Sequence, residues 1–472
     1  MRRYVFIILF FVVLVSPFVL RKAVGRPAVE HTAKDEAELV IISPHVEGIR
    51  REFADAFKAW HQHHYGTPVE IDYRNYGGAS EIVRFFEASK PLFRQLGTYK
   101  IDLVWGGGDY LFDQQLKKPG YLEPVAIDPA IMRKAFPKPD LGGVALYDPS
   151  NPPQWFGVVL ASFGIAYNRD VCRHLGVPEP KTWKDLADAR YRNWLVLADP
   201  TRSASAKQAF MTIVEYAMAQ AKAAGRSEDD GWADGMGLVR QIAANARQFT
   251  DGSASIPGVI SSGDAAAGMA IDFYGRSQVD AVGEARMGYV EPAGATAINP
   301  DPVAMVKGAP HREIAKHFIE FLLSEKAQKL WNTRAGAPGG PKQTSLRRLP
   351  IMPSVYEHDE NFTDKVNPFT ESGGFNKSNA REATFGILGE LIQFSCMDLL
   401  DDLRETREAI LASPISEELD KQLGRFPFNQ KEALARMKAW KSSPPAERLA
   451  LQRRWIDEFR QEYARLRAAA EK

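Results

Sequence analysis

Residues 38–43 have the sequence Glu-Leu-Val-Ile-Ile-Ser, a short apolar run with β-branched side chains that stops at Pro44. A run of this length bounded by turn residues predicts a buried strand. Ile49, Phe53 and Phe57 follow at helical spacing and predict an amphipathic helix directly after it. Because strand, loop and helix follow one another here, the stretch predicts an α/β fold with a parallel sheet.

The same alternation continues along most of the chain. Further strands are predicted at 69–73 and 102–105, with a helix starting near Ser80. A second α/β unit is predicted with strands at 155–167, 195–198, 268–272 and 285–291 and a helix at 204–224. Beyond it we expect a short strand at 304–306, a helix at 313–331 and a charged helical segment after Leu349. The pattern therefore predicts two α/β units followed by helices.

The composition excludes several classes of protein. The 472 residues are 45% hydrophobic, which is enough for a sizeable core and rules out wholesale disorder. The chain has 60 Lys and Arg residues and 59 Asp and Glu residues, and this net charge of +1 argues against a nucleic-acid partner. Cys172 and Cys396 cannot make a disulfide-rich scaffold, and we expect two buried thiols rather than one long-range disulfide.

Residues 1–25 are predicted to be a signal peptide or a membrane anchor. Arg2 and Arg3 precede an apolar run over residues 4–20, as in export signals. Residues 23–25 have the small-x-small pattern of a cleavage site, yet the basic pair before them is unusual for a cleaved signal. In both cases we expect the rest of the protein to be periplasmic or otherwise extracytoplasmic. Removing the four basic residues of this segment would change the net charge from +1 to −3.

Common catalytic signatures are missing from the sequence. It has no G-x-x-x-x-G-K-[ST], G-x-S-x-G, H-E-x-x-H or C-x-x-C motif. His61, His63 and His64 resemble metal ligands, but at the end of an amphipathic helix they are predicted to be a solvated last turn. We therefore expect no enzymatic activity, no cofactor and no resident metal.

Four loops follow the C-terminal ends of predicted parallel strands, the edge at which open α/β sheets bind ligands. They contain Ser43, the turn Gly78-Ala79-Ser80, the pair Trp105-Gly106, and Arg202 with Ser203 and Ser205. Two of the loops lead into helices, whose free N–H groups and partial positive charge attract anions. The alternative is that Ser80 and Ser203 are plain N-caps. Four such loops together favour a binding site.

A fifth candidate follows a strand of the second unit. Asp272, Phe273 and Tyr274 are polar and aromatic at the point where that strand ends, which suits contact with a ligand. Trp105 and Phe163 have the same two interpretations, since each could pack against the sheet or form the wall of a cleft.

Six segments, taken in order, resemble those of a known family. They are 102–108 (DLVWGGG), 162–169 (SFGIAYNR), 180–186 (PKTWKDL), 198–203 (ADPTRS), 268–274 (GMAIDFY) and 315–328 (AKHFIEFLLSEKAQ). In order and spacing they are similar to the extracellular solute-binding proteins of bacterial ABC importers. The resemblance is to the branch with ferric-iron, thiamine, polyamine and phosphonate binders, and it covers roughly residues 38–345.

The resemblance implies the two-lobed periplasmic-binding-protein fold, an α/β fold in which hinge strands join the lobes. One lobe would comprise residues 38–150 and 295–345, the other residues 155–290, and residues 350–472 would be a C-terminal helical extension. The lobes would close on one ligand. The ligand-binding residues would be Ser43, Gly78, Ala79, Ser80, Trp105, Gly106, Ser162, Phe163, Arg202, Ser203, Ser205, Asp272, Phe273 and Tyr274.

The resemblance also implies a function, namely solute capture for an ABC importer with a permease and an ATPase as partners. The Arg and Ser content of the loops favours an anionic organic solute such as a phosphonate, phosphate ester or carboxylate. Ferric-binding relatives usually use adjacent tyrosines near the position where this chain has Phe273-Tyr274, so one phenolate ligand is missing and the resemblance favours iron less. Ferric iron held by Tyr274, with His45 or Glu291 in place of the missing phenolate, is the alternative. A ligand sensor held by an uncleaved anchor is another. We expect a monomer that contacts the membrane through its N-terminal segment.

Overall fold

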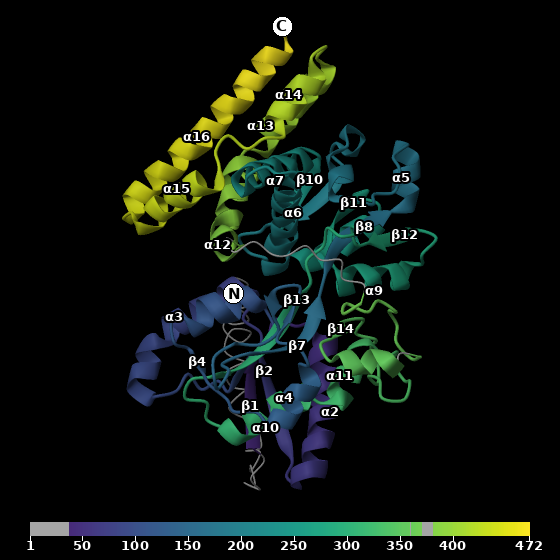
Figure 1. The fold of residues 1–472 in the computed structure, drawn as a ribbon, viewed down its shortest axis with the longest axis vertical. Helices are drawn as coiled ribbons and strands as arrows, with labels where there is room; N and C mark the ends of the chain where they lie inside the picture. The colour runs from purple at the N-terminus through teal and green to yellow at the C-terminus, as the bar shows by residue number, and fades with distance from the viewer. Residues whose placement is uncertain (1–36, 359, 371–380) are drawn as a thin grey trace, which may run out of the picture.

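Two β-sheets, one above the other in Figure 1, organise the chain into two lobes. The computed structural model describes residues 37–358, 360–370 and 381–472. The predicted signal peptide or anchor at 1–25 lies outside these residues. The larger sheet has the strand order β14-β7-β13-β3-β1-β2, with β4 (Leu122–Glu123) paired to β13, and the smaller has the order β10-β9-β11-β8-β12. The predicted α/β fold with two lobes is confirmed.

The first lobe is built as its opening stretch predicts. Strand β1 (Ala37–Ile42) pairs in parallel with β2 (Val69–Arg74) and β3 (Leu103–Trp105). Helices α2 (Glu47–Tyr65) and α3 (Ala79–Leu96) connect them. Phe53 and Phe57 of α2 are fully buried against the sheet because they lie on the apolar face that the spacing predicts.

The second lobe has a mixed sheet with helices packed on it. Strand β9 (Leu195–Ala198) runs parallel to β10 (Ala246–Thr250) and β11 (Ala267–Ile271). Strand β8 (Phe163–Asn168) is antiparallel to β11 and to β12 (Met287–Val290). Helices α6 (Ala204–Ala223), α7 (Glu228–Ala244) and α9 (Asp272–Val282) belong to this lobe, and α6 packs closely on α7.

The chain crosses between the lobes at two short hinges. The predicted strand 155–167 is two strands in different sheets, since β7 (Phe156–Ala161) pairs with β13 of the larger sheet and β8 pairs in the smaller. The crossing point is therefore Ser162 and not residue 155, the expected start of the second lobe. The return crossing lies between β12 and β13 (Asn299–Val306), a strand that is longer than the predicted 304–306. The last residue of β7, Ala161, pairs with the first residue of β13, Asn299. The two crossings therefore lie side by side.

Two helix predictions need correction. The helix expected at 313–331 is broken into α10 (Arg312–Leu322) and α11 (Glu325–Asn332), because the Ser324 side chain caps α11 by accepting a hydrogen bond from the Ala327 N–H. His61 of the expected solvated turn is buried. One of its ring nitrogens lies 3.0 Å from the Thr67 carbonyl and the other 3.2 Å from Nδ1 of His317 on α10.

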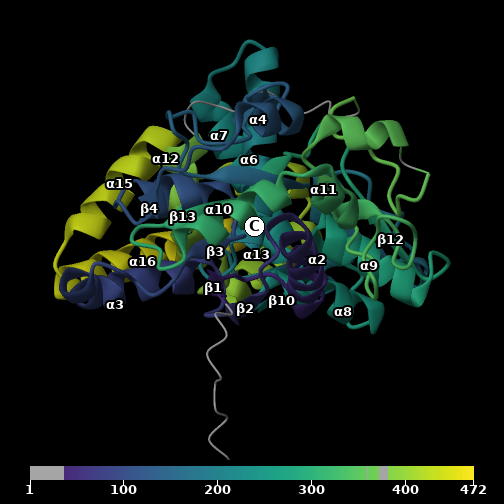
Figure 2. The same ribbon diagram turned by 90° about the horizontal axis from the view of Figure 1, so that it is seen from below.

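The C-terminal part contributes to both lobes. Strand β14 (Leu349–Pro350) pairs with β7, so the larger sheet continues past residue 345. The helices that follow are α12 (Arg381–Ile392), η6 (Gln393–Met397), α13 (Leu400–Ala412), α14 (Ser416–Leu423), α15 (Gln430–Ser442) and α16 (Pro445–Ala470). They pack on α6 and α7 of the second lobe. Figure 2 shows α12, α15 and α16 on one side of the molecule, opposite α8 (Ile256–Ser261) and α9.

A buried arginine joins this helical extension to the second lobe. Arg240 of α7 is fully buried and donates hydrogen bonds to both carboxylate oxygens of Glu462 on α16, each at 3.0 Å. It also donates to the carbonyls of Leu423 and Arg425. These bonds satisfy a charge that would be costly to bury alone, so the extension is firmly docked.

Two further sequence expectations concern membranes and thiols. Among the described residues, no single helix is long and apolar enough to cross a membrane. Two consecutive helices, Ala383–Met397 and Leu400–Ala412, are together long and apolar enough to do so, but they are bent by 62° relative to one another. Cys172 and Cys396 are both buried and free, as predicted.

Candidate functional site

A cleft of about 490 Å³ lies between the two lobes. The first lobe contributes the loops after β1, β2 and β3, the start of β13, and Arg348. The second lobe contributes β8, the loop from β9 into α6, residues 251–254 and the start of α9. Phe385 of α12 lines it as well. The cleft therefore lies at the C-terminal ends of parallel strands in both lobes, the place where α/β sheets bind ligands.

The first-lobe side of the cleft is held by a buried charged cluster. The Asp301 carboxylate accepts hydrogen bonds from Arg348 Nη1 (2.9 Å) and from the Gly107 and Gly108 N–H groups (2.9 and 3.1 Å). His45 Nε2 lies 3.1 Å from the same carboxylate, and Ser43 Oγ lies 3.0 Å from His45 Nδ1.

The protonation of this cluster follows from its surroundings. Burial lowers the pKa of His45 below its ordinary value of 6.5, which favours the neutral ring. Its Nε2 lies 3.1 Å from the Asp301 carboxylate and 3.1 Å from Arg348 Nη1. Burial alone would raise the pKa of Asp301, but Arg348 and the His45 hydrogen bond hold it well below its usual range. Arg348 is 1% exposed, and its buried Nε has no hydrogen-bond partner among the residues that the structure describes. The cluster therefore places at the cleft a buried guanidinium whose charge is balanced by the Asp301 carboxylate.

The glycines after β3 make this cluster possible. Gly106 has φ +95°, and a Cβ built there would lie 2.7 Å from the His45 ring. Gly107 and Gly108 also have positive φ, which turns their N–H groups toward Asp301. The glycine run predicted as a ligand turn thus supports the histidine and the aspartate that line the cleft.

Two helix N-termini meet across the cleft, one from each lobe. Helix α3 begins after Gly78, which has no side-chain cap, and α6 begins after Ser203, whose Oγ accepts from the Ala206 N–H. Ser80 Oγ lies 3.4 Å from the Thr201 carbonyl, so the lobes touch here. Both helices are long enough for a full macrodipole, and their positive ends point into one space.

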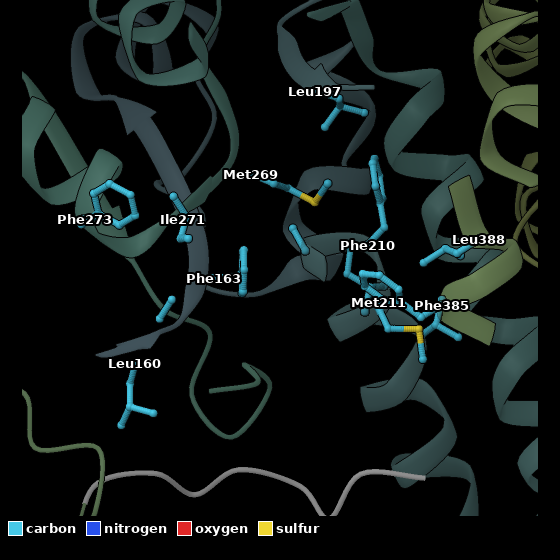
Figure 3. Packing of buried hydrophobic residues seen from close by; sticks show 14 of the residues in the cluster. Leu160, Phe163, Leu197, Phe210, Met211, Met269, Ile271, Phe273, Phe385 and Leu388 are labelled. Atoms are coloured by element: carbon cyan, nitrogen blue, oxygen red, sulfur yellow. The ribbon is translucent and has the colours of Figure 1, made fainter. Parts of the chain in front are cut away.

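Aromatic side chains form much of the second-lobe wall. Phe163, Phe273 and Tyr274 line the cleft, and the Phe273 and Tyr274 ring centroids are 4.2 Å apart. The guanidinium carbon of Arg348 lies 4.7 Å from the centroid of the Phe273 ring, a cation–π contact between the lobes. Figure 3 shows Phe163, Ile271 and Phe273 around the hinge strand. These rings limit the access of water to the charged cluster.

The first hinge is tied to α9 by a buried carboxylate. Asp272 Oδ2 accepts hydrogen bonds from the Ser162 N–H (3.1 Å) and the Ser162 hydroxyl (3.3 Å), while the Asp272 N–H donates to the Ser162 carbonyl (3.0 Å). Both residues are fully buried. Burial raises the pKa of Asp272 to about 6. The pair fixes the hinge and does not itself line the cleft.

The structure divides the predicted site residues into two groups. Those that line the cleft are Gly78, Ala79, Ser80, Phe163, Arg202, Ser203, Ser205, Phe273 and Tyr274, together with His45. Those behind its walls are Ser43, Trp105, Gly106, Ser162 and Asp272, which position His45 or the hinge. Trp105 is fully buried and packs on His45 and Phe53, so it supports the wall from behind. Arg202 is exposed and paired with Asp251.

Sequence reasoning missed several residues that line the cleft, among them Asp301, Arg348, Lys207 and Phe385. Asp301 lies between Pro300 and Pro302, just before the predicted short strand. Two prolines restrict the backbone around it, and this local signal could have drawn attention to Asp301. Arg348 lies in a segment with no helical or alternating pattern, and no motif could have singled it out.

The residues proposed for ferric iron are only partly assembled. Tyr274 and His45 line the cleft, but Glu291 is ion-paired with Arg276. Both ring nitrogens of His45 already have partners. Within the described ranges, no group of three or more His, Cys, Asp or Glu residues could hold a metal ion.

Comparison with known proteins gives a consistent result. The family model described as bacterial extracellular solute-binding protein matches residues 108–353. A phosphoglycerate transport regulatory protein of Salmonella typhimurium is 27% identical over 173 residues, which cover 37% of this chain and 39% of that protein. Iron uptake protein A1 of Synechocystis is 25% identical over 228 residues, 45% of this chain and 58% of that one. The chain thus spans less than two thirds of either relative.

A solved structure shares the fold. The periplasmic binding protein AfuA from Actinobacillus pleuropneumoniae, bound to fructose-6-phosphate, aligns with a TM-score of 0.54 and 18% identity. The alignment covers 78% of this chain and 96% of that one.

Proposed function

Because the chain belongs to the bacterial extracellular solute-binding protein family, we propose that it captures a small anionic organic solute outside the cytoplasm and delivers it to an ABC importer. The protein performs no chemistry on the solute. A phosphate ester, phosphonate or carboxylate enters the cleft, both lobes contact it, and this differential contact selects the closed form. The permease and ATPase of the importer are the partners.

The observation that carries the proposal is the meeting of two positive helix ends across the cleft. The N-termini of α3 and α6 touch at Ser80 and Thr201, and their free N–H groups suit the oxygens of a phosphate or carboxylate. Arg348 adds a buried guanidinium from the first lobe. The name of the Salmonella relative, a phosphoglycerate transport regulatory protein, supports a phosphate ester.

A ligand panel tests the proposal. Thermal unfolding is measured with 3-phosphoglycerate, methylphosphonate, citrate and ferric iron, and bound ligands are confirmed by calorimetry. A solute at 100 times its Kd should stabilise the protein by about 2.7 kcal/mol. If only ferric iron stabilises the protein, and this effect is lost in Tyr274→Phe, the ligand is ferric iron and not an organic anion. No shift with any organic anion would reject the proposal.

A second candidate is a ligand sensor with the same lobes. It is supported by the word regulatory in the name of the Salmonella relative. Uptake of the solute is measured after deletion of the gene, with the importer expressed from a constitutive promoter. Loss of uptake supports delivery to the importer, whereas unchanged uptake supports sensing.

A further inference from the structure

Helix α12 belongs to the C-terminal extension, yet it reaches the cleft. It packs on α6 of the second lobe, where Phe385 and Leu388 lie beside Phe210 and Met211 (Figure 3). Phe385 is also one of the residues that line the cleft. The extension is therefore in a position to influence binding.

The Phe385 ring also touches the first lobe. Its centroid lies 4.5 Å from that of Tyr110, which precedes the helical turn Leu111–Lys117 of the first lobe. The next residue, Gly386, comes so close that a Cβ there would lie 2.9 Å from the Tyr110 hydroxyl. Lys441 of α15 donates to the Gly386 carbonyl at 2.6 Å and holds this turn in place. The extension thus bridges the two lobes beside the cleft.

A lysine lies under the same ring. Lys207 of α6 lines the cleft, and its Nζ lies 5.5 Å from the centroid of Phe385. Gly389 leaves room for it, since a Cβ there would lie 3.3 Å from Nζ. Burial lowers the pKa of Lys207, and the nearby charge of Glu390 partly offsets this. The charges of Glu390 and Asp199 act on Lys207, but Glu390 pairs with Lys441 and no ion pair between described residues includes Lys207. The geometry leaves this cation for a group from outside the protein.

We propose that the C-terminal extension is part of the binding site: Phe385 clasps the lobes through its contact with Tyr110, and the same ring packs over Lys207 of α6 and orients that side chain toward an anionic group of the solute. A contact made only when the lobes are together favours the closed form, and the walls it builds limit the size of the solute. The lysine half of the proposal rests on the proposed function. The clasp half does not, because it concerns the lobes alone.

The clasp is tested without any solute. Spin labels on Arg94→Cys and Lys222→Cys, exposed positions on α3 and α6, report the separation of the lobes, and the two native thiols are buried. Phe385→Ala should raise the ratio of open to closed molecules by roughly two- to tenfold, the range for an aromatic pair. Phe428→Ala, a partly buried ring of the extension that does not line this cleft, is the matched control and should leave the ratio unchanged. Equal distance distributions in both variants would overturn the clasp.

The lysine is tested by calorimetry with 3-phosphoglycerate as the probe. Lys207→Met should weaken binding roughly tenfold or more, as expected for loss of a hydrogen bond to a charged group, and should leave the lobe separation of the unliganded protein unchanged. Equal affinity in Lys207→Met and wild type would overturn the role of the lysine. If the wild type binds no anionic probe, the lysine half fails together with the proposed function, and the distance measurement still decides the clasp.

Discussion

Replacement of Asp272 by asparagine should change how the stability of the protein depends on pH. The side chain is fully buried at the first hinge, and Asn keeps the carbonyl oxygen that accepts from Ser162. Asn does not titrate, whereas burial raises the pKa of Asp272 from 3.8 to about 6. The variant therefore removes one buried ionisation and preserves the hinge contact.

The magnitude follows from the pKa shift. Each unit corresponds to about 1.4 kcal/mol, so the shift is worth about 3 kcal/mol. Between pH 3.8 and about 6 the folded protein holds a proton that the unfolded chain has released, so this group lowers the free energy of unfolding as the pH rises. The cost is absent below pH 3.8 and complete above about pH 6. Relative to wild type, Asp272→Asn should therefore gain about 3 kcal/mol of stability from pH 3.5 to pH 7.5.

Urea unfolding followed by tryptophan fluorescence at a series of pH values measures this difference. A constant offset between the two proteins is allowed, because the amide differs from the acid at every pH. Asp401→Asn, whose side chain is 90% exposed, is the control and should change stability by no more than about 0.5 kcal/mol. A difference between Asp272→Asn and wild type that stays constant within about 1 kcal/mol over this range would refute the reasoning.

Three further substitutions test the buried cluster beside the cleft and the packing of the C-terminal extension. Arg348→Met should cost about 3–5 kcal/mol of stability, because it leaves the buried Asp301 carboxylate without its guanidinium partner. Adding Asp301→Asn should restore stability, measured by urea unfolding, but should not restore anion binding, measured by calorimetry. Gly106→Ala should destabilise by about 1–3 kcal/mol, because φ is +95° and the new Cβ would meet a histidine ring; an unchanged melting temperature would contradict this. Gly237→Ala should displace the C-terminal helices, because its Cβ would lie 1.9 Å from the Gly424 carbonyl oxygen; limited proteolysis should cut that region sooner, and equal cleavage rates would contradict the close packing.

The elements that could be predicted from sequence are those with a strong local pattern. The run at 38–43 and the helical spacing of Phe53 and Phe57 specify one strand and one face of a helix, and both are present. The hinge at Ser162 could not be located, because the residues on both sides of it form buried strands with the same apolar character. Only pairing with distant strands assigns β7 to one sheet and β8 to the other.

The candidate site shows the same division. Loops after strands, such as Gly78 to Ser80, were found because turn residues and strand ends are local signals. Arg348 joins the cleft through its pairing with Asp301, 47 residues earlier in the chain, and Phe385 joins it through helix packing. Arg202 had the right chemistry in a good position, but an exposed partner, Asp251, shares its charge. Long-range contacts of this kind leave no trace in the local sequence.

The facing ends of α3 and α6 have a consequence for the importer. Two positive dipole ends repel one another, which opposes the contacts that hold the lobes together, and an anion between them would convert this repulsion into attraction. The anionic solute that we propose would then act as a counter-ion that stabilises the closed form. An importer that recognises only the closed form would then hydrolyse ATP only when a solute-loaded binding protein docks on it.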